Sequence, residues 1–171
     1  TRRSSDLPAG TSTGTATVFI ETGGVTRNYG QVQITQFAPG LFAANASGNG
    51  VVAAVALRVQ ADGKQRYESV AEFDPAQNRI VARPIDLGAE TDRVFLLLFG
   101  TGWRGRTALD AFKVKIGGLD TLVSFAGAQP DFIGLDQLTV ELPRSLKGKG
   151  ESPINFTVDG KAANVVTVTI Q

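Results

Sequence analysis

Three glycines, at positions 100, 102 and 105, form the stretch of this chain whose spacing matches a known chemical motif. The run Gly100-Thr101-Gly102-Trp103-Arg104-Gly105 fits G-x-G-x-x-G, follows six large apolar residues, and precedes Asp120 by about twenty residues. In dinucleotide-binding proteins such glycines let the amides of a helix N-terminus approach a pyrophosphate, and an acidic residue binds the ribose. The value of the motif therefore depends on the elements around it.

Those elements do not provide the chemistry. A crossover helix must fit inside a βαβ unit of about thirty residues, but the next alternating segment already begins at Phe112. Asp120 falls in a predicted hairpin turn and not at the end of a strand. We interpret the glycine run as a turn between the strands of a sandwich, and we expect no cofactor.

Catalysis and metal binding are limited by composition, because the 171 residues contain no histidine and no cysteine. A Ser-His-Asp triad, a Cys-His pair and a transition-metal site each need one of them. Carboxylate pairs remain, with Glu68, Glu72 and Asp74 as candidates, but these alternate along a strand into a turn, where solvated side chains are favoured. We predict that the chain is not an enzyme and has no catalytic residues.

A second acidic group, in the loop of Asp86, Glu90 and Asp92, could offer oxygen ligands to calcium. Its spacing matches no known calcium loop, so a turn capped by its own carboxylates is favoured and no metal site is predicted. The net charge of +1 offers no basic surface for nucleic acid. The longest run of large apolar residues has six members and the longest apolar run of any kind, residues 51–57, has seven, against about 20 for a bilayer span, so no membrane insertion is expected.

Trp103, the single tryptophan, is the strongest candidate for a ligand-binding residue. It lies between glycines and next to Arg104, with Arg106 close by. An exposed aromatic ring beside arginines is a frequent binding anchor, and sugar-binding modules use such residues. The favoured alternative is that the ring folds back over the edge of the sandwich.

Alternation of apolar and polar residues predicts an all-β chain. Residues 94–99 are predicted to form a strand buried on both faces, with Leu97 in the core. About six strands at the spacing typical of immunoglobulin-like (Ig-like) sandwiches follow in residues 94–171, and residues 37–93 are predicted to be a β-rich connector. Hairpin turns are expected at Gly23-Gly24, Asp62-Gly63, Gly117-Gly118 and Asp159-Gly160.

An internal repeat appears when the sequence is shifted by 136 residues. The shift places Val18 on Ile154, Ile20 on Phe156, Gly24 on Gly160, Asn28 on Asn164, Val32 on Val168 and Ile34 on Ile170. Residues 8–36 are therefore predicted to be the trailing strands of a truncated Ig-like unit. Their apolar face is expected to dock on residues 51–73, or else to stay exposed and promote self-association.

The start of the chain has a different origin in this interpretation. The first seven residues, Thr-Arg-Arg-Ser-Ser-Asp-Leu, resemble the translation of a sequencing-library adapter, and methionine is absent. We expect residues 1–7 to be an artefact, and the chain to be a fragment of a longer metagenomic reading frame.

Several stretches carry a family resemblance: residues 38–42, 73–79, 125–129, 134–137 and 159–164. Together they resemble an uncharacterised C-terminal domain of large secreted acidobacterial proteins, over residues 38 to 171. The final unit is also similar to the Ig-like IPT/TIG modules. The resemblance implies a bacterial extracellular or surface location and offers no functional residues.

These observations predict a non-catalytic extracellular module at the C-terminus of a larger secreted or surface protein, serving spacing, anchoring or adhesion. The alternative is a carbohydrate-binding module that uses Trp103 and its adjacent loops. The expected partners are an unknown protein or polysaccharide and the other domains of the parent chain.

Overall fold

The computed structural model describes residues 10–171, and the adapter-like residues 1–7 lie outside the described residues. Strands make up 55% of the structure and helix 4%, so the predicted all-β fold is confirmed. Helical turns within the described part are the two short 3-10 segments η1 (Leu109–Ala111) and η2 (Arg144–Leu146). Among residues 10–171 no helix is long and apolar enough to cross a membrane.

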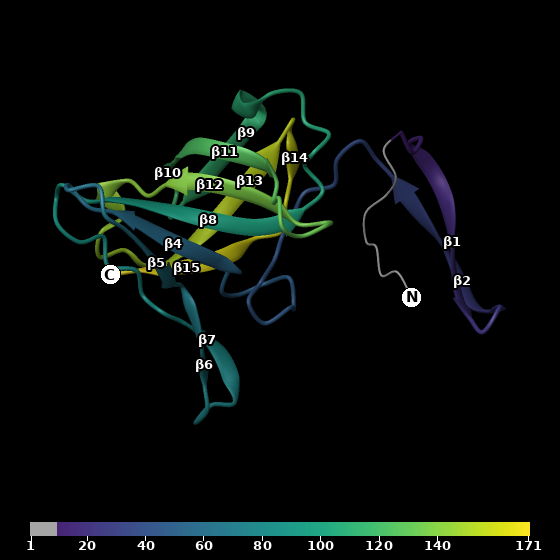
Figure 1. Ribbon diagram of the computed structural model, residues 1–171, viewed down its shortest axis with the longest axis horizontal. Coiled ribbons are helices and arrows are strands. Elements are labelled where there is room, and N and C mark those ends of the chain that lie inside the picture. The colour runs from purple at the N-terminus through teal and green to yellow at the C-terminus, as the bar shows by residue number, and fades with distance from the viewer. Residues whose placement is uncertain (1–9) are drawn as a thin grey trace.

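Two antiparallel sheets pack face to face and form the body of the protein (Figure 1). The six-stranded sheet has the order β11-β12-β8-β4-β5, and β3 also pairs with β8. Its strands are β3 (Gly40–Leu41), β4 (Ala54–Val59), β5 (Gln65–Ser69), β8 (Arg93–Thr101), β11 (Leu122–Ala128) and β12 (Asp136–Glu141). The five-stranded sheet contains β9 (Phe112–Ile116), β10 (Leu119–Asp120), β13 (Gly150–Val158), β14 (Lys161–Ala162) and β15 (Val166–Ile170).

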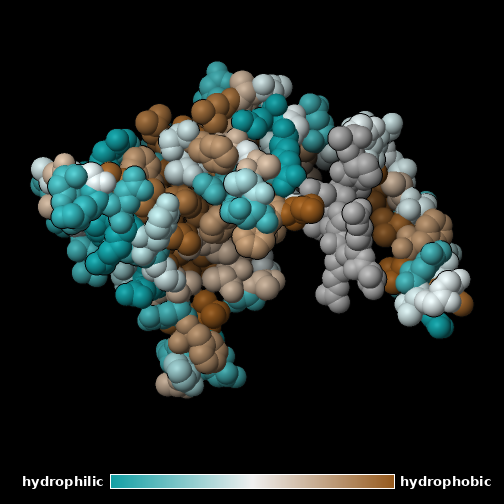
Figure 2. All heavy atoms as spheres, in the orientation of Figure 1, coloured by the Kyte–Doolittle hydropathy of each residue, from teal (hydrophilic) through white to brown (hydrophobic). Residues whose placement is uncertain are grey.

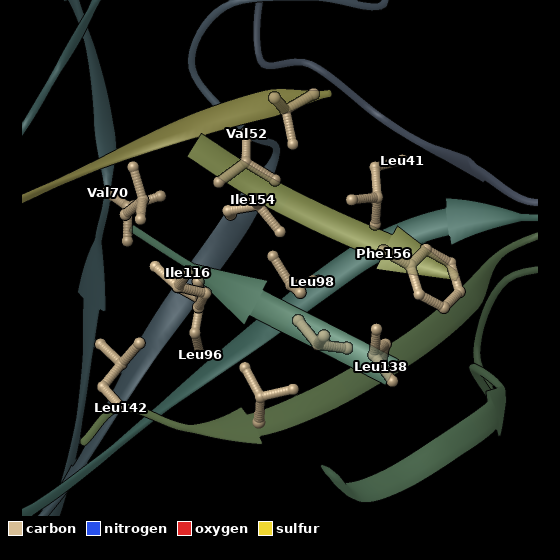
Figure 3. Packing of buried hydrophobic residues seen from close by; sticks show 14 of the residues in the cluster. Leu41, Val52, Val70, Leu96, Leu98, Ile116, Leu138, Leu142, Ile154 and Phe156 are labelled. Carbon is tan, nitrogen blue, oxygen red and sulfur yellow. The ribbon is translucent and has the colours of Figure 1, made fainter. Parts of the chain in front are cut away.

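Alternate side chains of the two sheets point inward and make one hydrophobic core (Figure 3). Leu96 and Leu98 of β8 are 0% exposed and face Ile154 and Phe156 of β13, which are 0% and 2% exposed. The period of two in each strand separates the inward residues from the outward ones, as it does in sandwiches generally.

The predicted connector, residues 37–93, is part of this same sandwich. Its strand β4 is hydrogen-bonded to β8 along its whole length, from Ala54 opposite Leu98 to Val59 opposite Arg93. The Val52 amide donates to the Thr167 carbonyl at 2.9 Å, which joins the segment to β15 as well. A boundary between residues 93 and 94 would therefore divide a single sheet, because the sequence pattern identifies strands but not their partners.

The central strand β8 departs from its predicted burial. Leu96 and Leu98 are core residues, but Leu97 is only half-buried, on the outer side of the six-stranded sheet. Placing Leu97 in the core and burying the strand on both faces was wrong, because a two-layer sandwich has no third layer to cover the outer side of a sheet.

Two hairpins stand apart from the body in Figure 1. One is β1 (Gly14–Thr22) with β2 (Val25–Ile34), and the other is β6 (Ala71–Asp74) with β7 (Arg79–Ala82). No strand of the two sheets pairs with β1 or β2 within the described residues, and Val18, Ile20 and Val32 are 47%, 58% and 46% exposed. The favoured docking of this face on residues 51–73 was therefore wrong.

Candidate interaction surface

The three glycines of the G-x-G-x-x-G run pack against the backbone of residues 36–40. A β-carbon at any of the three would overlap a carbonyl oxygen of the extended segment 36–40. The overlapping pairs are Gly100 with Gly40, Gly102 with Ala38, and Gly105 with Gln36. The Ala38 amide donates to the Gly102 carbonyl at 2.8 Å, and the Gln36 side-chain amide donates to the Gly105 carbonyl at 3.0 Å. The space above the glycines is filled by protein backbone.

A substitution tests this packing. Gly102 has a φ of +88° and faces the Ala38 carbonyl, so Gly102→Ala is expected to cost backbone strain of about 1–3 kcal/mol and also to displace the segment. Gly63→Ala is the matched control, because Gly63 has a φ of +82° and nothing within 4 Å of its β-carbon position. Urea denaturation should show a larger loss for Gly102→Ala; equal losses would mean that the close approach contributes nothing.

Trp103 lies inside the sandwich, with 0% of its surface exposed. Its ring meets Phe156 edge-on at 5.3 Å between centroids and also lies against Gly100. The indole nitrogen has no hydrogen-bond partner in the part of the chain that the structure describes. The ring offers no surface to a ligand, and its position matches the interpretation that it folds back over the sandwich.

Arg104 and Arg106 make structural contacts that hold the loop around Trp103, and their side chains do not converge on a shared site. The Arg104 guanidinium pairs with the carboxylate of Asp136, which is 1% exposed, and donates to the Leu135 carbonyl at 2.9 Å. The Arg106 guanidinium lies over the ring of Phe112, 5.5 Å from its centroid. The predicted ligand-binding residues are therefore structural in their observed positions.

The acidic loop 86–92 is held by arginines. Arg58 donates to the Asp86 carbonyl at 2.6 Å and pairs with Asp92 at 3.3 Å, and Arg144 pairs with Glu90 at 3.2 Å. No group of three acidic residues within residues 10–171 could hold a metal ion. The carboxylates of Glu90 and Asp92 fasten the loop to the body. The Asp86 carboxylate accepts the Gly88 amide at 2.9 Å, which agrees with the predicted capped turn.

The acidic candidates Glu68 and Asp74 make separate structural contacts and do not form a carboxylate pair. Glu68 points at Arg58, with 3.0 Å between Oε1 and Nε, while Asp74 accepts the amide of Ala76 at 2.8 Å and caps the β6–β7 turn. That backbone hydrogen bond lowers the pKa of Asp74. Each of the two carboxylates is thus engaged in a structural contact.

The surface that sequence reasoning missed is the outer side of the six-stranded sheet. Cross-strand neighbours there form apolar rows, such as Phe95 beside Leu57 beside Tyr67, and Leu97 beside Val55. We call this the aromatic face: Phe42, Val55, Leu57, Tyr67, Phe95, Leu97, Phe99, Leu122 and Phe125. Figure 2 views this side, and brown and tan atoms gather over the middle of the body.

Exposure on the aromatic face is large for apolar side chains. Leu122, Tyr67 and Phe125 are 69%, 63% and 43% exposed, and Leu97 is half-buried between its neighbours. The outer side of the five-stranded sheet is polar instead, with Lys113, Lys115, Glu151, Asn155, Thr167 and Thr169. Exposed sheet faces are normally of the polar kind, and contiguous exposed apolar patches mark interaction sites.

The charges on the aromatic face neutralise each other. Arg93 makes two hydrogen bonds to Glu141, of 2.8 and 2.7 Å, and its guanidinium lies 4.9 Å from the centroid of the Phe95 ring. The hydrogen bond from Arg93 lowers the pKa of Glu141. The sequence did carry a signal for this face, because both parities of residues 94–99 are apolar and only one of them can point into a two-layer core.

Comparison of the chain with protein-family models, with curated proteins and with solved structures finds no match. The geometry of the chain itself is therefore the basis for a function.

Proposed function

We propose that this chain is a non-catalytic, extracellular structural module of a larger secreted or surface protein, and that it pairs with a second copy through the aromatic face. The single observation that carries the proposal is the contrast between the two outer faces of one sandwich, one polar and one apolar. Homophilic pairing of such modules would hold neighbouring parent proteins together, which is a form of adhesion. The Ig-like, IPT/TIG-like character belongs to this proposal and rests on the resemblance of residues 38–171.

A second copy suits the face better than a polysaccharide does. The charges of Arg93 and Glu141 are already paired, and polar groups such as the Tyr67 hydroxyl and the side chains of Gln137 and Thr139 are few. Ligand sites for polar molecules place several hydrogen-bonding groups around the ligand, whereas homodimer interfaces are apolar and poor in charge. Two copies of a sheet face can pack with their strands about 30° apart in an isologous pair.

The size of the face predicts a weak pair. Five strands about 4.8 Å apart and about six residues long cover about 20 by 20 Å, or about 400 Å². Two copies then bury at least about 800 Å², at or below the lower end of specific interfaces. Weak contacts of this kind become effective when several modules are linked, which fits a component of a larger surface protein.

Leu97→Lys is expected to abolish the pairing, because it would place an unpaired ammonium in the middle of the apolar contact. Thr169→Lys is the matched control, since Thr169 is half-buried on the outer side of the five-stranded sheet. Sedimentation velocity over a range of concentrations should show dimers for the wild type and for Thr169→Lys, and monomers for Leu97→Lys.

Two results would end the proposal. One is a wild-type chain that stays monomeric at the highest soluble concentration. The other is a dimer that survives Leu97→Lys. Polysaccharide pull-down by the wild type that is lost in Tyr67→Ala would instead assign the aromatic face to the carbohydrate alternative.

A further inference from the structure

The β1–β2 hairpin has the same register as the hairpin that closes the sandwich. Adding 136 to each number turns the pairs of β1 and β2 into the pairs that β13 makes with β14 and β15. Gly14↔Ile34, Ala16↔Val32 and Val18↔Gly30 become Gly150↔Ile170, Ser152↔Val168 and Ile154↔Val166. Glu21↔Thr26 and Thr22↔Val25 become Thr157↔Ala162 and Val158↔Lys161. Two hairpins of one chain thus share every one of these pairings.

Their turns share a backbone conformation as well. Gly23 and Gly24 have φ angles of +60° and +75°, and Asp159 and Gly160 have +46° and +78°. Consecutive positive φ values define the tight turn that matches the twist of a two-stranded hairpin. The strands β1 and β13 each have nine residues, so the two hairpins agree in length, register and turn.

The side chains follow the same inward and outward pattern. Val18, Ile20 and Val32 correspond to core residues Ile154, Phe156 and Val168, which are 0%, 2% and 1% exposed. The other side of the hairpin carries Thr15, Thr17, Gln31 and Gln33, which correspond to Glu151, Pro153, Thr167 and Thr169. It also carries one cross-strand aromatic pair, Phe19 and Tyr29, which are 59% and 73% exposed. The hairpin therefore carries one half of a sandwich core that the described residues do not cover.

An asparagine gives the same assignment independently. In the body, Asn164 accepts the Leu41 amide at 2.8 Å and donates to the carbonyls of Leu41 and Gly48 at 2.9 and 2.6 Å. It thereby ties the end of β3, at Leu41, to the closing hairpin. The corresponding Asn28 is exposed, and the bond seen for its side chain is to the neighbouring Tyr29 amide at 2.8 Å.

We infer that β1–β2 is the closing hairpin of a preceding β-sandwich of the same polypeptide, with the fold of residues 37–171, and that the six-stranded sheet of that unit covers its apolar face. A second copy of this chain cannot accept the hairpin, because its own β13 and β15 already cover its six-stranded sheet. The acceptor must be a sandwich without a closing hairpin, and strand order places such a body directly before residue 14. The inference does not depend on the pairing of aromatic faces.

Residues 36–38, which follow β2, make contacts that extend the inference to the connection between the two units. Gln36 and Ala38 are hydrogen-bonded to the Gly102–Gly105 loop, and the Lys161 ammonium donates to the Phe37 carbonyl at 3.1 Å. The ring of Phe37 packs against the core. The preceding unit is therefore held by a fixed segment at this end of the sandwich and not by a free tether.

Hydrogen exchange measured by mass spectrometry tests the inference on two proteins. In the 171-residue chain, residues 14–34 are expected to exchange rapidly while residues 150–170 are protected. In the parent protein, expressed from its gene with the natural sequence upstream of residue 8, the exchange of residues 14–34 should slow by about 1,000-fold or more, since exchange would then require opening of a whole folded unit.

Matched substitutions identify which side of the hairpin is covered. In the parent protein Val18→Asp should lower the melting temperature of the preceding unit, and Thr17→Asp, on the other side of β1, should not. Neither should change the melting of the body in the 171-residue chain. Unchanged rapid exchange in the parent protein would overturn the inference, as would a gene with no sandwich-sized segment before residue 14. Protection that grows with the concentration of the 171-residue chain would assign the face to a second copy and overturn it too.

Discussion

Leu98→Ala is expected to lower the free energy of unfolding by about 2–5 kcal/mol, because it opens a cavity in a close-packed core. Leu98 is 0% exposed and lies between the two sheets (Figure 3). Leu97→Ala is the matched control in the adjacent position, where the side chain is half-buried on the aromatic face. Its expected cost is about 1 kcal/mol, since little packing is lost at a partly solvated site.

Urea denaturation of the two variants, with unchanged m-values, gives the comparison directly. Equal losses would contradict the two-layer arrangement, because both side chains would then have to be fully covered. A larger loss for Leu97→Ala than for Leu98→Ala at dimer-forming concentrations would show that the second copy contributes to the stability of the sheet.

Arg58→Met is expected to destabilise the fold by about 3–5 kcal/mol, the cost typical of removing one partner of a buried ion pair. The Arg58 side chain is 11% exposed and pairs with Glu68 at 3.0 Å and Asp92 at 3.3 Å. A β-carbon on Gly88 would also overlap the Arg58 guanidinium, so the loop is fitted around it. Without Arg58, Asp92 and Glu68 lose their buried partner and the 86–92 loop loses a fastening.

Arg66 provides a control on the same carboxylate. It also lies 3.0 Å from Oε1 of Glu68, but its side chain is 75% exposed. Arg66→Ala is therefore expected to cost no more than about 1 kcal/mol, as exposed ion pairs do. Thermal or urea melts that rank Arg66→Ala above Arg58→Met would refute the assignment of the buried contact.

Acid titration checks the Arg58 contact in a second way. Burial alone would raise the pKa of Glu68, but hydrogen bonds from Arg58 and Arg66 and their charges hold it below its ordinary value of 4.5. A lowered folded pKa means that the stabilisation is complete above the unfolded pKa and is lost as pH falls through the folded one. Stability should therefore begin to fall as the pH drops below about 4.5, and this fall should be smaller in Arg58→Met.

Much of the fold could be predicted because strands and tight turns are encoded locally. Alternation along residues 112–116, 138–142 and 166–170 depends only on which side of a sheet is covered. The turns at Gly23-Gly24 and Asp159-Gly160 need positive φ, which glycine supplies without strain. The 136-residue shift worked for the same reason, since side chains at corresponding positions face the same way.

The rest depends on partners that are distant in sequence. Nothing in residues 51–59 indicates that β4 pairs with β8 or that Val52 bonds to β15. The single sandwich was therefore predicted as two parts, a connector of residues 37–93 and a unit of residues 94–171. Trp103 has the neighbours of an exposed anchor, and its burial follows from the glycine at position 100, against which the ring lies. The aromatic face was missed because residues 94–99 are apolar at both odd and even positions, which suggests a strand covered on both sides. In the structure only one side of this strand is covered by the second sheet.

The order of these pairings determines when the protein can fold during its synthesis. Amides at Leu41, Val52 and Ile85 bond to Asn164, Thr167 and Thr169 respectively, so the earliest strands of the sandwich wait for the last ones. The two sheets cannot close until the C-terminal strand has left the ribosome, and chains dominated by such distant contacts fold slowly. In the secreted module proposed above, this delay would keep the chain open for passage through an export channel.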